Sequence, residues 1–86
     1  MYKVEMARPV QRTLDRLPRR DSEAIMDRLD DLAKTPRPRG VEKIRSRSDL
    51  WRIRQGDYRI VYSIDDEQKV INVWGIGHRR DVYRSL

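Results

Sequence analysis

The chain has 86 residues, of which 37% are hydrophobic and 40% are charged, with no cysteine and a formal net charge of +6. This length suits one modest core, so we expect residues 1–86 to form a single domain. The lack of cysteine excludes a disulfide framework and thiolate metal sites, and no apolar run approaches the roughly 20 residues of a membrane span. We therefore expect a soluble, cytoplasmic protein that makes no membrane contact.

The first part of the chain has the pattern of a strand followed by two helices. Residues 2–6 alternate apolar and polar side chains, which predicts a strand. Apolar residues recur at helical spacing over residues 8–17, and Pro18 ends this helix. A second helix is predicted to start with Asp21 or Ser22 as its N-cap. A helical hairpin with one apolar side needs a sheet to lie on.

From residue 41 onward the apolar period changes to two, which indicates strands. We expect a weak strand and three strong ones, over residues 41–45, 50–55, 59–64 and 70–74. The predicted fold class is α+β: an N-terminal strand and a helical hairpin packed on a mostly antiparallel four-stranded sheet, followed by a short C-terminal helix. The aromatic residues are expected to pack in the core or on the sheet, and these are Trp51, Tyr58, Tyr62 and Trp74.

Positive charge is concentrated on the predicted hairpin and its surroundings. Residues 37–60 contain 8 Lys or Arg against 3 Asp or Glu, a net of +5, whereas residues 1–36 contain 8 against 7. This distribution favours a polyanion or an acidic protein as the partner.

The register of the hairpin can be predicted from its apolar residues. Pairing Arg54 with Arg59 places Ile53 beside Ile60 on the core face. A slip of one residue would push arginine against that apolar face. The register that buries the isoleucines therefore gathers Arg52, Arg54 and Arg59 on the opposite face. Like charges at this spacing repel each other, and a fold that tolerates them usually uses them.

Three segments together carry a family resemblance. They are Trp51-Arg52-Ile53-Arg54, Gly56-Asp57-Tyr58-Arg59-Ile60-Val61-Tyr62 and Gly77-His78-Arg79-Arg80-Asp81-Val82-Tyr83. With these motifs the chain resembles the RelE branch of the RelE/ParE toxin superfamily, the toxin halves of toxin–antitoxin pairs, over essentially its whole length. The resemblance implies one RelE-like toxin domain and an acidic-tailed antitoxin that wraps the toxin.

The resemblance also implies an activity and a site. Members of the RelE branch are small ribonucleases that enter the ribosomal A site and cut mRNA. Their active-site positions match Arg52, Arg54, Arg59, Arg79 and Tyr83 of this chain. No cofactor is implied.

The chemistry of metal-independent RNA cleavage fits these residue types. The 2′-OH attacks the adjacent phosphate, so cations must stabilise the charge that develops there. We interpret the three hairpin arginines as a phosphate clamp, because the guanidinium group matches phosphate oxygens. Arg79 would bind the scissile phosphate or protonate the leaving group, and Tyr83 would orient a nucleotide or accept the 2′-OH proton. Further RNA contacts are assigned to Lys43, Arg45, Arg47 and Arg80.

The remaining polar residues have simpler interpretations, and other functions are compatible with the sequence. His78, the one histidine, is given a structural or orienting role, with burial as the simplest expectation. The acidic groups at residues 30–31 and 65–67 are interpreted as solvated charge, and no metal site is expected. Two alternative functions stay open: a ParE-like toxin that inhibits DNA gyrase without nuclease activity, and a catalytically inert basic binding module.

Overall fold

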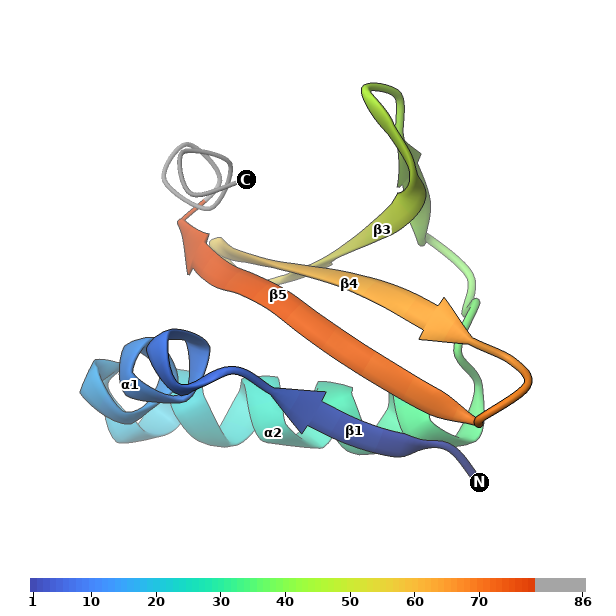
Figure 1. Cartoon of the computed structure of the whole chain (residues 1–86). Coiled ribbons are helices and arrows are strands. Elements are labelled where there is room, and N and C mark those ends of the chain that lie inside the picture. Colours follow the sequence, from blue (N-terminus) through green and yellow to red (C-terminus); the bar gives the residue numbers. More distant parts are fainter. Residues whose placement is uncertain (79–86) are drawn as a thin grey trace.

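The computed structural model describes residues 1–78, apart from the side chain of Ser48. Within this range a sheet carries two helices on one face, which confirms the α+β class (Figure 1). The elements in chain order are β1 (Lys3–Met6), α1 (Arg8–Arg16), α2 (Arg19–Lys34), β2 (Glu42–Ile44), β3 (Arg47–Gln55), β4 (Tyr58–Asp65) and β5 (Val70–His78). The predicted C-terminal helix lies outside the described residues.

The N-terminal strand is part of the sheet. The described strands are ordered β1-β5-β4-β3-β2, a sheet of five strands, so the prediction of four was wrong. β1 runs parallel to β5, with Lys3 opposite Val70 and Met6 opposite Val73. The other neighbours are antiparallel. Alternation in the sequence reveals a strand but not the strand it pairs with. Parallel neighbours are joined by long crossovers, so the partner of a parallel strand can lie far away in the sequence.

The two helices start and end close to prolines. Pro9 occupies the first turn of α1, where its missing N–H leaves no hydrogen bond unmade. α2 begins at Arg19 rather than after Asp21 or Ser22, so the predicted N-cap was wrong. Pro18 is the N-cap instead, and its carbonyl oxygen accepts hydrogen bonds from the backbone N–H groups of Asp21 and Ser22 at 2.9 and 3.0 Å.

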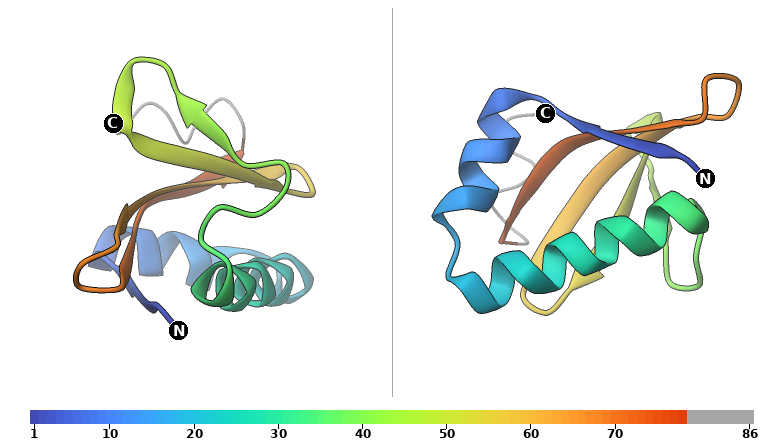
Figure 2. Two further views of the ribbon diagram at one scale, coloured as in Figure 1. Left: turned by 90° about the vertical axis from the view of Figure 1, so that its right-hand side faces the viewer. Right: turned by 90° about the horizontal axis from the view of Figure 1, so that it is seen from below.

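The main core lies between the helices and one face of the sheet, here called the first face (Figure 2). Its buried residues come from α1, α2 and the three strands β3, β4 and β5. They are Val10, Leu14, Ile25, Leu29, Leu32, Ile53, Ile60, Tyr62, Ile71, Val73 and Ile76. Tyr62 is fully buried, and its hydroxyl donates to the carbonyl oxygen of Pro36 at 2.8 Å. This bond ties the loop after α2 to the core.

The opposite face, here called the second face, has a small apolar cluster of its own. Leu50 and Val61 are buried there, and Ile44 packs against them. The β2–β3 hairpin rises from the sheet on this side (Figure 1). The cluster therefore supports the base of this hairpin on the face away from the helices.

β5 runs to His78 and is longer than predicted, and a bulge interrupts its pairing with β4. Val61 pairs with Gly75 but Tyr62 pairs with Val73, which leaves Trp74 as an extra residue. Trp51 and Tyr58 pack against the core as expected, but Trp74 is 50% exposed. Its indole Nε1 donates to the hydroxyl of Ser63 at 2.9 Å. Trp74 therefore lies on the sheet surface, the second of the two predicted placements, and not in the core.

Asp66 joins three separate parts of the chain. Its Oδ1 accepts a hydrogen bond from the Tyr2 hydroxyl at 2.6 Å, and its Oδ2 accepts one from Nη2 of Arg37 at 2.9 Å. The N-terminus, the segment after α2 and the β4–β5 turn are thereby connected. Hydrogen bonds from Arg37 and then from Tyr2 lower the pKa of Asp66.

Removing the Tyr62 hydroxyl should destabilise the fold. In Tyr62→Phe the buried Pro36 carbonyl loses its donor, and we expect the free energy of unfolding to fall by about 1–3 kcal/mol. Urea denaturation measures this. Tyr2→Phe is the matched control, because its hydroxyl bonds to exposed Asp66, and it should cost less. Equal losses in the two variants would contradict the role of burial.

The Asp66 cluster should make stability depend on acid pH. The pKa of Asp66 is lower in the folded protein than its ordinary value of 3.8. The stabilisation that ionised Asp66 gives the fold is therefore complete above pH 3.8 and is lost as the pH falls through the folded pKa. The stability difference between wild type and Asp66→Asn should therefore be larger near pH 7 than near pH 3. The neighbouring Glu67→Gln variant serves as control and should follow wild type at both values. If the stability difference between wild type and Asp66→Asn does not change with pH, the predicted coupling of stability to the ionisation of Asp66 is contradicted.

Candidate functional site

The hairpin of β3 and β4 has the predicted register. Arg54 pairs with Arg59, Ile53 with Ile60, and Arg52 with Val61. Ile53 and Ile60 are buried on the first face, where they pack against the helices. Each arginine is next to one of these isoleucines in sequence, and neighbouring residues of a strand point to opposite faces. Arg52, Arg54 and Arg59 therefore lie on the second face. This group of Arg52, Arg54 and Arg59 is here called the arginine cluster.

A carboxylate that the sequence analysis did not single out lies against this cluster. Glu42 on β2 is in register with Arg52, and its Oε2 accepts a hydrogen bond from Nη2 of Arg52 at 2.9 Å. This bond and the charge of Arg52 lower the pKa of Glu42, and the charges of Arg59 and Arg54 act in the same direction. The strand pattern over residues 41–45 was the available signal. A register shift between Lys43 and Ile44 made its pairing unpredictable.

Arg54 and Arg59 are held next to each other by the pairing of β3 and β4. Within residues 1–78 neither forms a salt bridge. Arg54 is exposed, and Arg59 is partly buried. Opposed like charges destabilise a strand pair, so the hairpin carries an electrostatic cost that a bound anion would relieve.

Glycines of β5 lie beside the arginine cluster. Gly77 pairs with Arg59 and Gly75 pairs with Val61, both on the second face. A glycine within a strand often marks a place where another backbone or a ligand approaches closely. The cluster is therefore flanked on one side by two strand residues that carry no side chain, of which Gly75 is buried and Gly77 is partly buried.

A depression of 370 Å³ lies at the end of the hairpin. Its lining is mostly polar and comes from β3, the following loop, β4 and the end of β5: Arg54, Gly56, Asp57, Tyr58, Arg59 and His78. Gly56 has a φ of +61°, a left-handed conformation that glycine adopts without strain. The tight loop thus leaves space beside two of the arginines.

His78 lies at the rim of this depression but belongs to the first face. It pairs with Tyr58, and the centroids of the two rings are 4.7 Å apart. The Tyr58 hydroxyl in turn donates to Oδ2 of Asp21 on α2 at 3.3 Å. His78 is exposed, so the expectation of a buried histidine was wrong. Its ring packs on an aromatic neighbour, which is consistent with a positioning role.

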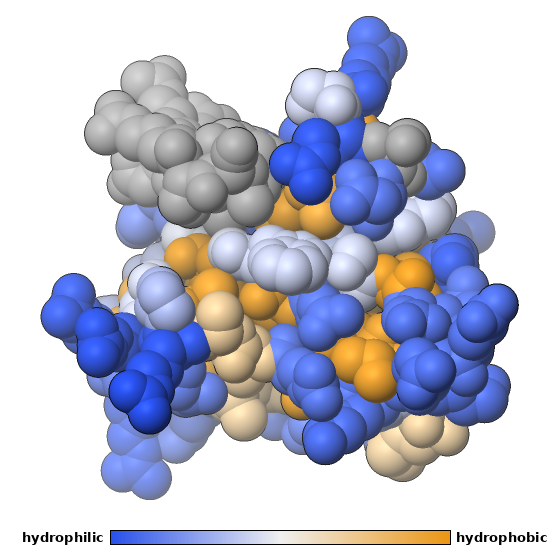
Figure 3. Space-filling view, viewed as in Figure 1, coloured by the Kyte–Doolittle hydropathy of each residue, from blue (hydrophilic) through white to orange (hydrophobic). Residues whose placement is uncertain are grey.

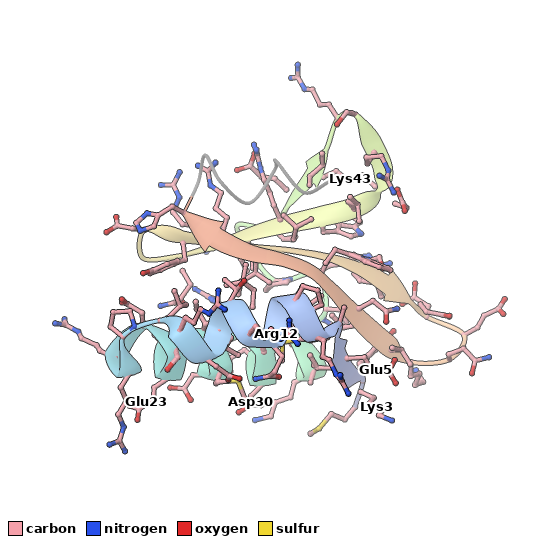
Figure 4. The ribbon with its side chains drawn as sticks, turned by 60° about the vertical axis from the view of Figure 1, so that its left-hand side comes forward. Lys3, Glu5, Arg12, Glu23, Asp30 and Lys43 are labelled. Atoms are coloured by element: carbon pink, nitrogen blue, oxygen red, sulfur yellow. The ribbon has the colours of Figure 1, made fainter. Side chains whose placement is uncertain are left out.

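The basic residues of the β2–β3 hairpin are only partly associated with the cluster. Lys43 is in register with Trp51, and its Nζ lies 5.2 Å from that ring (Figure 4). Glu42 is on the same face as Arg52, so Lys43, the residue that follows it, points to the opposite face of the hairpin. Arg45 and Arg47 are exposed near the hairpin tip. Arg79, Arg80 and Tyr83, the remaining predicted site residues, lie outside the described residues.

The described residues group no set of metal ligands, and some of them line a second depression that is partly apolar. Among residues 1–78, no three His, Cys, Asp or Glu side chains are grouped so that they could hold a metal ion. A second depression, of 630 Å³, lies between α1 and β5 and includes Val10, Leu17, Trp74 and Ile76. Hydrophobic side chains reach the surface amid polar ones on the side of the molecule shown in Figure 3.

No helix within residues 1–78 has the length and apolar character needed to cross a membrane.

Comparison with known proteins identifies the family. Residues 4–83 match the family model for the ParE toxin of the type II toxin–antitoxin system parDE. Toxin RelG of Mycobacterium tuberculosis is 32% identical over 84 residues, which cover 96% of this chain and 97% of RelG.

Solved structures agree with the sequence matches. A chain of the archaeal RelE–RelB complex from Pyrococcus horikoshii superposes with a TM-score of 0.81 and 32% identity, covering 93% of this chain and 97% of that one. The isolated RelE toxin of E. coli gives a TM-score of 0.79 and 25% identity, covering 96% and 92%. The chain therefore belongs to the RelE/ParE superfamily of toxins from type II toxin–antitoxin systems.

Proposed function

We propose that the chain is a ribosome-dependent endoribonuclease that cuts mRNA by metal-independent attack of the 2′-OH on the adjacent phosphate. The observation that carries this proposal is the arginine cluster, in which Arg54 and Arg59 are paired directly. Guanidinium groups bind phosphate oxygens with matched geometry, and they stabilise the charge that builds up during the attack. A cationic group held on paired strands also needs little reorganisation during the reaction.

The proposed roles follow from the chemistry of each side chain. Arg52, Arg54 and Arg59 bind the phosphates on either side of the cut and the phosphate under attack. Arginine stays protonated, so it is a poor base. Arg79 and Tyr83 complete the site in this proposal, on the strength of the family motif, with Arg79 at the leaving group and Tyr83 at the nucleotide or the 2′-OH. In this proposal the chain itself holds no metal ion.

The proposed protein partner is an antitoxin with an acidic tail, and the proposed location is the cytoplasm, where mRNA is translated. RelE of E. coli is known in an intact RelBE toxin–antitoxin complex. The net charge of +6 complements an acidic chain. The apolar depression between α1 and β5 provides hydrophobic surface for the same partner.

Inhibition of DNA gyrase is the second candidate function, because the matching family model describes ParE toxins. The arginine cluster favours RNA cleavage over this alternative, since a protein–protein inhibitor needs no phosphate clamp. The third possibility, an inert basic module, would bind RNA without cutting it.

Purified protein in a translation reaction tests the proposal. We expect mRNA cuts that depend on ribosomes and follow the codon phase, mapped by primer extension, with the same mRNA without ribosomes as the control. Intact mRNA together with gyrase-linked DNA breaks would instead support the second candidate. Intact mRNA with retained RNA binding would support the third.

Alanine at Arg54 or Arg59 should slow mRNA cleavage by about 10²–10³-fold, because each variant removes a cation that stabilises the transition state. The rate is measured in the same translation reaction. Arg12→Ala is the matched control, because Arg12 is an exposed arginine on α1, beneath the first face (Figure 4). Cleavage that survives unchanged in Arg54→Ala and Arg59→Ala would contradict the clamp.

His78→Gln should keep most of the cleavage activity. General acid–base catalysis contributes about 10²–10⁴-fold, so a loss smaller than about tenfold would fit a positioning role against Tyr58. A larger loss, with a changed pH–rate profile, would instead make His78 the proton acceptor or donor.

A further inference from the structure

Glu42 places a negative charge on the face that carries the arginine cluster. Its Oε2 lies 2.9 Å from Nη2 of Arg52, across the β2–β3 pair. The charges of Arg54 and Arg59 also lower the pKa of Glu42, so all three arginines act on this carboxylate. An ionised carboxylate therefore faces the positions that the proposed function assigns to phosphate.

Carboxylates and phosphates are alternative ligands of one guanidinium group. The fork of N–H donors in arginine matches both anions, so the group that holds Glu42 is also the group suited to a phosphate. The side chains of Arg52 and Glu42 are 35% and 65% exposed. An ion pair with this much solvent contact is weak, and a phosphate can replace the carboxylate at little cost.

The surroundings of the pair leave room for such an exchange. Glu42 and Arg52 line a depression of 420 Å³ together with Lys43, Ile44 and Arg45. Ile44 packs on the buried Leu50–Val61 cluster and anchors the strand from which Glu42 projects. The strand can therefore stay in place while the carboxylate releases Arg52.

We propose that Glu42 is a positioning residue that competes with RNA phosphate for Arg52. In the free protein its carboxylate holds the guanidinium group on the sheet and offsets part of the repulsion within the arginine cluster. When RNA binds, a phosphate takes the place of the carboxylate. The inference rests on the proposed function in one respect, namely that RNA is the ligand of the second face.

This competition has a measurable consequence for RNA affinity. Each phosphate that a protein neutralises releases counterions, which makes binding weaken as salt increases. If Glu42 must give up Arg52, the freed carboxylate attracts a cation, and this uptake reduces the net release. Removing the carboxylate should therefore both tighten binding and steepen its salt dependence.

The test compares Glu42→Gln with Glu67→Gln on a short single-stranded 2′-O-methyl RNA, which cannot be cleaved through its 2′-OH. Each variant removes one negative charge, so both have a net charge of +7 instead of +6. Glu67 lies in the β4–β5 turn between Asp65 and Val70, away from the β2–β3 pair. The control therefore matches the change in net charge without touching Arg52.

We expect Glu42→Gln to bind about two- to fivefold more tightly than Glu67→Gln at low salt. The slope of log K against log salt should be steeper by up to about 0.7, the value for one further phosphate contact on a single strand. Equal affinities and slopes for the two variants would overturn the inference while leaving the proposed function standing. A wild-type protein that does not bind the RNA would also overturn the inference, whereas the proposed function is tested separately by ribosome-dependent cuts in the translation reaction.

Carboxyl NMR of the wild-type protein supplies a second readout that does not depend on a variant folding. The pKa of Glu42 should rise when RNA saturates the protein, because Arg52 leaves the carboxylate and a negative phosphate arrives. A pKa that is the same with and without RNA would overturn the inference.

Discussion

The pairing of Ile53 with Ile60 is the constraint on which the rest of the molecule depends. These side chains pack against the helices, because the apolar stripe of α2 is buried on this face of the sheet. Side chains alternate across a strand, so burying the two isoleucines forces Arg54 and Arg59 together on the other face. Hydrophobic burial on one side of the sheet thus creates a concentration of positive charge on the other.

The second face accommodates this charge through features of its other strands. β2 contributes the carboxylate of Glu42 against Arg52. β5 contributes Gly75 and Gly77, which add no side chain beside the arginines. What remains is a pair of adjacent guanidinium groups whose repulsion an anionic backbone would relieve. The same arrangement that costs stability in the free protein favours a phosphodiester ligand, which links the hairpin register to the proposed activity.

Membership of the superfamily settles the fold and the toxin class, but not the target. The chain matches a family model for ParE toxins and is similar to RelG and to RelE structures. A shared fold carries different functions when the side chains on one surface change. Here the covered face, with its helices and isoleucines, holds the main core. The arginine cluster on the other face is the feature on which the proposal of RNA cleavage rests.

The sequence by itself determined the elements, the hairpin register and the gathering of Arg52, Arg54 and Arg59, because local alternation and a single apolar face allow one solution. It did not determine that β1 joins the sheet beside β5, since parallel pairing connects distant segments. Nor did it determine that Glu42 meets Arg52, because an irregular strand with exposed residues has no apolar pattern to set its register. The bulge that exposes Trp74 was likewise decided only by tertiary structure, since it arises from a mismatch between two strands.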